Sequence, residues 1–476
     1  MNFRKKSIST ILINSNSGKN SLKQVLGATD LILLGIGCII GTGIFVLTGI
    51  AASEHAGPAL VLSFIISGIV CAFAALCYSE LASSLPATGS AYTYSYIAFG
   101  ELVAWITGWA LILEYGMAAS AVASGWSSYF QGLLNGFGLY LPTALTSGYN
   151  LEKGTFIDVP AIVIILTLTF LLSKGVRELT RVNSTMVIIK VGAVLLFIAV
   201  GVWYVQPDNW TPFMPFGFSG VAAGAATVFF AYLGFDVVST AAEEVKNPQK
   251  NMPIGIIASL LICTALYMIV TLVLTGIVPY TELNVKNPVA FALNYIHQDW
   301  VAGFISLGAI TGMTTVLMGL IYAQTRLFFA MSRDGLFPKV LNKVNAKSDT
   351  PVVTTWVTGI LVAIFGGVIP LNKLAEMVSM GTLGAYIIVS LGVLSLRKTN
   401  PDLSRPFKAP FLPLITLLTV LSCGYLILNL SAVTWIACGA WFLIGLIIYL
   451  VFGRKNSNMA NQPLEEPTTL SQQENV

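Results

Sequence analysis

Charged side chains are scarce in this sequence: they make up 10% of its 476 residues, whereas 55% of the residues are hydrophobic. About a quarter of a soluble domain is charged, so this chain cannot cover itself with a water-facing surface. Histidine is rarer still, with only His55 and His297, which excludes a zinc triad of histidines and an HExxH motif. The sequence also lacks a P-loop and a GxSxG nucleophile elbow. We therefore expect no enzymatic activity, no cofactor and no metal site.

Long apolar stretches dominate the chain and determine its architecture. A helix needs about 20 mostly apolar residues to span the hydrocarbon core of a membrane, and such stretches recur between short charged segments. Their length excludes a closed barrel, whose strands are about 10 residues long. We therefore predict an all-α membrane protein with twelve transmembrane helices. The predicted spans are residues 31–53, 56–79, 102–130, 159–173, 182–205, 217–242, 252–278, 301–325, 350–370 and 377–396, with two more between residues 409 and 453.

Lysine and arginine lie mostly on one side of these spans. With both termini placed in the cytoplasm, 21 of the 25 basic residues fall in cytoplasmic segments; Lys153, Lys286 and Lys373 fall in outer loops, and Lys190 falls inside a span. Basic residues accumulate in cytoplasmic loops, so we expect a multi-pass protein of the cell (plasma) membrane with both ends inside. The same bias accounts for the net charge of +4. The lipid bilayer is thus the expected surrounding, no nucleic-acid partner is indicated, and the oligomeric state stays open.

Glycine is concentrated in the middle of two spans. The first span reads GIGCIIGTGIF over residues 35–45, and the sixth reads FFAYLGFD over residues 229–236. A GxxxG pair often serves only close helix packing, but a Gly-Thr-Gly in mid-membrane equally fits an unwound stretch whose backbone lines a cavity. The sixth span follows the first by five crossings and therefore runs in the opposite direction. Paired interrupted helices in two inverted halves indicate the substrate site of a transporter.

This relation between the two spans divides the chain into five parts. They are a cytoplasmic segment (1–28), a first five-helix repeat (29–205), a second, inverted five-helix repeat (206–396), two extra helices (397–453) and a cytoplasmic tail (454–476). The polar composition of the tail is typical of disorder.

The physics of a broken helix indicates which ligand it binds. Free N–H groups at one end attract an anion, and free carbonyls at the opposed end attract a cation. An amino acid carries both charges about one carbon apart, so the paired breaks predict an amino acid site.

Three blocks of residues resemble the amino acid-polyamine-organocation superfamily: Gly41 to Phe45 (GTGIF), Phe229 to Pro253 (FFAYLGFDVVSTAAEEVKNPQKNMP) and Gln324 to Gly335. Together with a lysine in the fifth span, they make residues 20–455 similar to bacterial members of its cationic amino acid transporter branch. The resemblance implies a leucine-transporter-like inverted repeat with the substrate between the first, third, sixth and eighth helices. It also implies backbone contacts around Gly41: the substrate carboxylate would meet N–H groups, and the ammonium would meet carbonyls. The N–H groups are those of Thr42 and Gly43, and the carbonyls are those of Ile39 or Ile40 and of Phe230, Ala231 and Leu233.

Side-chain recognition is expected to depend on the third and eighth spans. Glu114 is the one acidic residue of the third span, and a carboxylate at that depth indicates function; a structural bond to a neighbouring hydroxyl is the alternative. The resemblance places Glu114 beside the substrate. On the eighth span, Gly319 and Leu320 are expected to line a side-chain pocket that the glycine enlarges. Asp236 lies toward the cytoplasmic end of the sixth span, where we expect solvation or pairing with lysines and at most a gating role. Glu114 is then the one anionic group near the pocket, so we expect neutral substrates such as threonine, isoleucine, valine or alanine.

Lys190 is the basic residue inside the fifth span. Its long stem would allow it to snorkel to the membrane surface. The resemblance favours another interpretation, in which the ammonium replaces the sodium ion that other members of this fold hold between the first and eighth helices. Burial disfavours the charged form of an amine, so Lys190 would exchange protons and couple them to transport. The sequence thus predicts a permease that imports amino acids by proton symport with alternating access; an amino acid exchanger, a non-transporting sensor and a channel are the alternatives.

Overall fold

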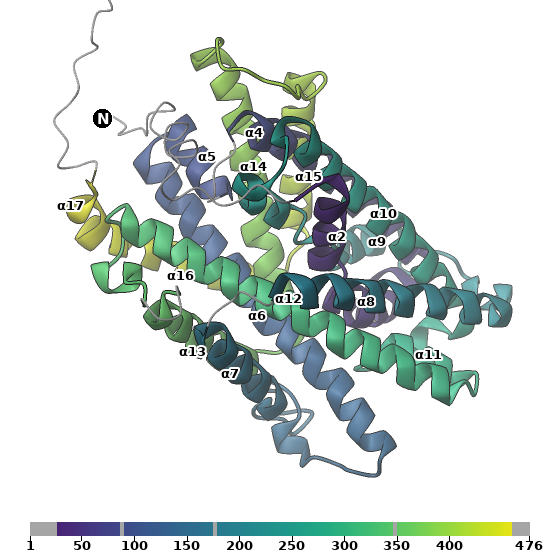
Figure 1. The fold of residues 1–476 in the computed structure, drawn as a ribbon. Coiled ribbons are helices and arrows are strands. Elements are labelled where there is room, and N and C mark those ends of the chain that lie inside the picture. Colours follow the sequence, from purple (N-terminus) through teal and green to yellow (C-terminus); the bar gives the residue numbers. More distant parts are fainter. Residues whose placement is uncertain (1–25, 86–89, 175–178, 346–349, 459–476) are drawn as a thin grey trace, which may run out of the picture.

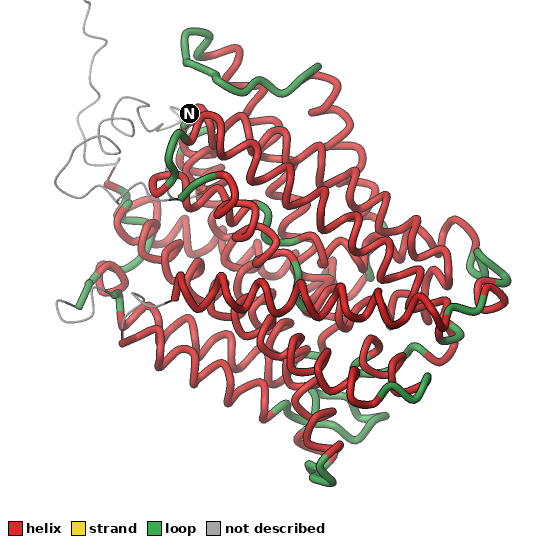
Figure 2. The backbone as a smooth tube through the Cα atoms, turned by 45° about the vertical axis from the view of Figure 1, so that its right-hand side comes forward, coloured by secondary structure: helices red, strands yellow, loops and turns green. Residues whose placement is uncertain are grey.

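The structure of the chain is a computed structural model, and it describes residues 26–85, 90–174, 179–345 and 350–458. Helices account for the secondary structure of these residues, and apart from isolated bridges no β-strand occurs among them (Figures 1 and 2). The all-α fold class is therefore as predicted. Most of the predicted N-terminal segment, and the predicted tail from residue 459 onward, lie outside the described residues.

Each of the twelve predicted spans contains a helix. By length and composition, eight helical segments of the described chain are sufficient to cross a membrane, and four shorter apolar helices accompany them. The number of crossings and the repeat therefore stay predictions. The eight segments are Gly43–Ser84, Glu101–Gly136 (α6), Thr185–Tyr204 (most of α8, Leu179–Gly201), Gly217–Ser239, Pro248–Ile277 (α10), Asp299–Arg333 (α12), Leu371–Thr399 (α14) and Ala432–Asn456 (which includes α16, Ala432–Ile448); the shorter helices are α2 (Ala28–Ile39), α7 (Val159–Lys174), α13 (Val352–Val368) and α15 (Leu412–Leu428).

The first predicted span is divided into two helical pieces. α2 ends at Ile39, and Ile40 has an extended backbone. The next helical segment begins with η1 (Gly43–Leu47) and continues through α4 (Leu60–Ser84). The glycine-rich block therefore forms an unwound stretch, as the second interpretation of its sequence predicts, and does not serve helix packing alone.

The sixth predicted span is interrupted in the same way. α9 (Gly217–Val228) tightens into η7 (Phe229–Tyr232), and the chain turns through Leu233 and Gly234 before η8 (Asp236–Glu244). Gly234 has a φ of 110°, which side chains rarely tolerate. A Cβ at this position would also lie 2.8 Å from the backbone of Cys38. Gly234 thus lets the two breaks touch.

Four of the helices surround these breaks. α6 and α12 pack against each other and cross the middle of the bundle, and α10 packs on both α2 and α4 (Figure 1). Hydroxyls join α4 to α9, because Ser63 and Ser67 each donate a 2.8 Å hydrogen bond to a carbonyl of α9, at Val221 and Ala225. The breaks therefore lie inside the bundle, between α6 and α12 on one side and α4 and α10 on the other.

Two short helices were not predicted from the sequence. α5 (Ser90–Ala98) precedes α6, and α11 (Pro288–Tyr295) precedes α12. Both are too short to span a bilayer. The predicted tail also begins as ordered structure, because α17 (Arg454–Asn456) extends the last helix and Ser457 donates to Glu101 Oε2 at 2.6 Å.

Candidate functional site

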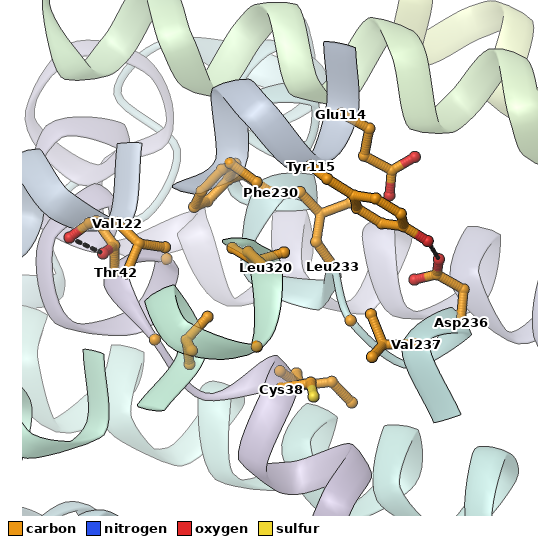
Figure 3. Close-up of a pocket in the computed structure, with 17 residues that line it drawn as sticks. Cys38, Thr42, Glu114, Tyr115, Val122, Phe230, Leu233, Asp236, Val237 and Leu320 are labelled. Carbon is orange, nitrogen blue, oxygen red and sulfur yellow. Dashed lines mark hydrogen bonds between the residues drawn. The ribbon is translucent and has the colours of Figure 1, made fainter. Parts of the chain in front are cut away.

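A pocket lies where the two breaks face α6 and α12 (Figure 3). It holds about 550 Å³ of empty space, including its opening. Thr42 and Val122 lie at one end of it, whereas Glu114, Tyr115 and Asp236 gather at the other. Nine of the eleven residues that the sequence assigned to substrate line this pocket: Ile39, Gly41, Thr42, Gly43, Glu114, Phe230, Leu233, Gly319 and Leu320.

The remaining two, Ile40 and Ala231, lie behind the pocket wall and not on it. The Ile40 carbonyl accepts a hydrogen bond from Lys190 Nζ at 3.0 Å. The Ala231 carbonyl accepts one from the Tyr267 hydroxyl at 2.9 Å. Both carbonyls freed by the breaks are thus held by side chains of neighbouring helices, α8 and α10.

Lys190 is fully buried, and its ammonium points at the end of α2. Besides Ile40, it donates to the carbonyl of Gly37. Its stem packs against Gly312 of α12, where a Cβ would lie 3.0 Å from Lys190 Cβ. The ammonium does not reach the membrane surface, as snorkelling would require, but joins α8 and α12 to the unwound end of α2.

Tyr267 joins the two breaks to each other. Its hydroxyl lies 2.9 Å from the Ile39 carbonyl and 2.9 Å from the Ala231 carbonyl. A hydroxyl has one proton to donate, so it satisfies one of these carbonyls at a time. Its ring packs on Phe64 and Tyr232, with centroids 5.4 and 5.5 Å away. No sequence pattern indicated this role, since a tyrosine in an apolar helix does not reveal its partner.

The expectation that the Asp236 carboxylate is solvated or paired with lysines was wrong. It is buried, it lines the pocket, and its Oδ2 accepts a hydrogen bond from the Tyr115 hydroxyl at 3.4 Å. Its Oδ1 has no hydrogen-bond partner within the described chain. Glu114 is also buried, and it interacts with the Thr382 hydroxyl. A structural bond to a neighbouring hydroxyl was the alternative to a role of Glu114 beside the substrate. The pocket therefore has two carboxyl groups at one end, not the single one expected.

The N-terminal end of η1 is fitted closely against the second break. A Cβ on Gly43 would collide with the backbone of Ala231, so the absence of a side chain lets η1 and η7 touch. The Thr42 hydroxyl donates to Met313 Sδ at 3.2 Å and lies 3.5 Å from the Val122 carbonyl. The first N–H groups of a helix lack intrahelical partners, and both Thr42 and Gly43, at the start of this helical segment, line the pocket.

The opposite wall leaves room. A Cβ on Gly319 would meet no atom within 4 Å, although the residue lines the pocket. Leu320 and Val316 flank it on the same helix. Sequence analysis missed Val316, together with Cys38, Ala118, Val122 and Val237, because apolar residues in a membrane helix look the same whether they face lipid or a cavity.

Comparisons with known proteins agree with this geometry. The family model described as amino acid permease matches residues 26–434. The chain is 54% identical over 460 residues to the branched-chain amino acid permease BcaP of Bacillus subtilis (strain 168), covering 96% of this chain and 98% of the relative. It is 53% identical over 455 residues to the methylthioribose transporter of the same organism, with the same coverage, and 40% identical over 409 residues to the vacuolar cationic amino acid transporter 4 of Arabidopsis thaliana, covering 84% and 67%. The chain therefore belongs to the amino acid permease family of the amino acid-polyamine-organocation superfamily, and is a membrane transporter related to bacterial permeases and cationic amino acid transporters, not an enzyme.

Proposed function

We propose that this protein imports neutral amino acids by proton symport, with the substrate held between the two helix breaks. The observation that carries the proposal is the pair of breaks facing one pocket, at Ile40–Thr42 and Leu233–Phe235. In this arrangement the substrate carboxylate meets the N–H groups of Thr42 and Gly43. The ammonium meets carbonyls at Ile39 and in the second break, while the side chain lies toward Gly319 and Leu320.

The proposed architecture is a five-plus-five inverted repeat with two additional helices, twelve crossings in all, in the cell membrane with both termini cytoplasmic. Support for the repeat comes from the matching positions of the two breaks, five predicted spans apart, each with a glycine at its turn. Support for the orientation comes from the basic residues, which are concentrated on the side of the termini.

Lys190 is the proposed proton-coupling residue. Its ammonium is the cation at the freed carbonyls of α2, a position that suits an ion because two carbonyl dipoles converge there. Protonated Lys190 holds α2 to α8 and α12. Neutral Lys190 releases α2 and so favours the change between the outward-facing and inward-facing states.

Neutral substrates remain the proposal although a second carboxyl group lines the pocket. Two close carboxyl groups share a proton readily, because both cannot ionise without repulsion. A pair that carries one proton attracts a cation less than two free carboxylates do. The relative named for branched-chain amino acids supports neutral, branched side chains. The relative named for methylthioribose favours a second candidate substrate of that kind, for which the space beside Gly319 is available.

The test is uptake into proteoliposomes that contain the purified full-length protein. Radiolabelled isoleucine is offered with and without an inside-alkaline pH gradient, and the twenty amino acids and methylthioribose are added as competitors. We expect accumulation only with the gradient and competition by branched and small neutral amino acids. Competition by lysine and arginine alone would overturn the neutral assignment.

The same experiment separates the alternatives. Uptake that needs internal amino acid and ignores the pH gradient would identify an exchanger. Binding without uptake would identify a sensor, and conducted currents with unitary steps would identify a channel. Uptake of methylthioribose with no amino acid competition would establish the second candidate.

A further inference from the structure

A chain of hydrogen bonds crosses one end of the bundle, away from the pocket. Lys286 Nζ donates to Gln131 Oε1 at 3.1 Å, and Gln131 Nε2 donates to Ser127 Oγ at 2.8 Å. Ser127 Oγ in turn donates to Asp158 Oδ1 at 2.5 Å. Because an ammonium only donates and a carboxylate only accepts, the direction of every bond in the chain is fixed. We call these four residues the outer chain.

The outer chain connects three separate parts of the protein. Lys286 lies just before α11, Gln131 and Ser127 belong to α6, and Asp158 directly precedes α7. The carbonyl of Thr146 reinforces the junction, since it accepts from Gln131 Nε2 at 2.8 Å and from Lys286 Nζ at 3.3 Å. Ser127, Gln131 and Asp158 are buried, whereas Lys286 is exposed. Lys286 is therefore the member that can leave the chain without unpacking the helices.

Lys286 anchors α11 and the residues beside it, which we call the α11 segment (residues 283–296). This segment lies on the helical stretch that begins at Gly43 and forms one wall of the pocket, which we call the half-helix. A Cβ on Gly49 would lie 2.6 Å from Pro288 Cβ, so the start of α11 fits closely against this half-helix. Tyr129 of α6 donates to the carbonyl of Phe45, one turn beyond the pocket, at 2.8 Å. The backbone N–H groups of Val289 and Ala290 face the same tyrosine. Lifting α11 would thus uncover the half-helix that starts at Gly43.

We propose that the outer chain is a proton-sensitive latch, in which ionised Asp158 helps to hold Lys286 and the α11 segment over this end of the bundle, and protonation of Asp158 loosens them. The placement of this end on the outer side of the membrane rests on the proposed function. The latch itself goes beyond that function, because it concerns access to the site and not binding or coupling within it.

The surroundings of Asp158 support this assignment. Burial raises the pKa of Asp158 to about 7, and Ser127, the Ala161 N–H, Lys286 and Ser124 act in the opposite direction. α6 presents only neutral groups to it, and α13 presents the Gly367 carbonyl, which accepts the Asp158 N–H at 2.8 Å. Among the described residues, Lys286 is the charged group that acts on Asp158, and Lys153 acts in turn on Lys286.

The direction of the pH effect follows from reciprocity. Docked Lys286 lowers the pKa of Asp158 and so favours its ionised form. By reciprocity, ionisation of Asp158 favours the docked position of Lys286 by the same factor in the equilibrium constant. The elements that bury Asp158, namely α6, α7 and α13, do not leave with the α11 segment. The carboxylate's contribution to the latch is therefore complete only above the pKa that Asp158 has with Lys286 undocked, which is higher than 7, and it is lost as the pH falls through about 7. Acid on the outer side would open the outer side, which suits import with protons.

The test is hydrogen–deuterium exchange of the backbone of residues 283–296 in the full-length protein in lipid nanodiscs, at pH 8 and pH 6. Each variant is compared with the wild type at the same pH, so that intrinsic exchange rates cancel. Asp158→Asn keeps an acceptor for Ser127 and mimics the protonated state. We expect it to exchange about two- to fivefold faster than the wild type at pH 8 and at the wild-type rate at pH 6. Lys286→Met should exchange faster than the wild type at both pH values.

Lys153→Met is the matched control, because it removes a positive charge from the same side and Lys153 makes no hydrogen bond to the outer chain. Since Lys153 repels Lys286, this variant should exchange no faster than the wild type at either pH value. An Asp158→Asn rate equal to the wild type at pH 8, or an excess that is the same at pH 6, would overturn the latch. If Asp158→Asn does not fold, the test uses the wild type alone. The ratio of its exchange rate in residues 283–296 to that in residues 206–210 should rise from pH 8 to pH 6, and a constant ratio would contradict the latch. The readout is conformational, so it does not depend on which substrate is transported.

Discussion

Lys190 and Ile40 are 150 residues apart in the chain, and the ammonium of the first donates a 3.0 Å hydrogen bond to the carbonyl of the second. The same ammonium satisfies Gly37, so one buried side chain holds two carbonyls that the end of α2 leaves free. A neutral amine has fewer protons to donate and no charge to attract the carbonyl dipoles. The charge of Lys190 therefore bears directly on the attachment of α2 to the rest of the bundle.

Removal of this charge should separate binding from coupling. We expect Lys190→Ala, and Lys190→Met with its longer stem, to retain part of the amino acid binding, because the N–H groups of Thr42 and Gly43 remain in place. Both variants should lose accumulation driven by a pH gradient, measured in proteoliposomes beside equilibrium binding. Gly192→Ala on the same helix, where a Cβ meets nothing within 4 Å, is the control and should transport normally. Accumulation by Lys190→Met that still follows the gradient would place coupling elsewhere, with Glu114 the next candidate.

Gly43 should tolerate no side chain. The reason is its contact with the second break. A Cβ would lie 2.5 Å from Ala231 Cβ and closer still to its backbone, which would push the two breaks apart. We therefore expect Gly43→Val, and already Gly43→Ala, to abolish substrate binding, measured as the loss of the substrate-induced rise in melting temperature.

Gly41→Ala is the matched control for this variant. Its Cβ would lie 3.5 Å from Val316 Cγ2, an ordinary van der Waals contact, so binding should weaken far less. Equal losses in Gly41→Ala and Gly43→Ala, both eluting as folded protein, would mean that contact between the breaks is not what Gly43 provides.

The positions of the breaks and of Lys190 could be predicted from the sequence because their signals are local. Glycines in mid-span weaken a helix wherever they occur, and a single base in an apolar span stands out by composition. The prediction for Asp236 was wrong because it assumed that the sixth helix is continuous, which would carry Asp236 toward the cytoplasmic end of the span. The turn at Leu233 and Gly234 shortens the path, so Asp236 remains at the pocket and does not reach the cytoplasmic end.

Long-range partners could not be predicted in this way. The Tyr267 hydroxyl contacts two carbonyls that are 228 and 36 residues away in the sequence, and Gln131 accepts a hydrogen bond from Lys286, 155 residues away in the sequence. Such pairs depend on how helices cross, which a single sequence does not encode in any local pattern. α11 was missed because an eight-residue helix in an outer loop has no span-length signal.

Gly319 should determine which side chains fit the pocket. A valine at this position enters open space, so it should fold normally and reduce the volume available to the substrate side chain. We expect Gly319→Val to weaken isoleucine more than alanine, by about 1–3 kcal/mol in relative affinity, measured by competition in uptake. Gly303→Val is the control, because Gly303 is on the same helix with equally open surroundings but does not line the pocket. Equal loss for isoleucine and alanine would assign Gly319 to a role in helix α12 and not to side-chain selection.

Tyr267 should matter for the substrate ammonium through the Ile39 carbonyl, which belongs to a residue that lines the pocket, and through its bond to the Ala231 carbonyl behind the pocket wall. Tyr267→Phe keeps the ring in its aromatic cluster and removes the one donor that these two carbonyls share. A buried polar group left unsatisfied costs about 1–3 kcal/mol, and the freed carbonyls lose their fixed direction. We expect weaker binding of leucine and little change for 2-hydroxyisocaproate, the analogue in which a hydroxyl replaces the ammonium.

Tyr232→Phe separates this effect from a general loss of stability. Tyr232 belongs to the same aromatic cluster, and its buried hydroxyl donates to the Phe64 carbonyl at 2.8 Å, on α4 and away from the breaks. Both variants should lower the melting temperature by similar amounts, because each removes one buried hydrogen bond of the same kind. Only Tyr267→Phe should reduce the ratio of leucine affinity to 2-hydroxyisocaproate affinity. If both variants leave that ratio unchanged, Tyr267 only stabilises the bundle and has no part in positioning the Ile39 carbonyl for the substrate.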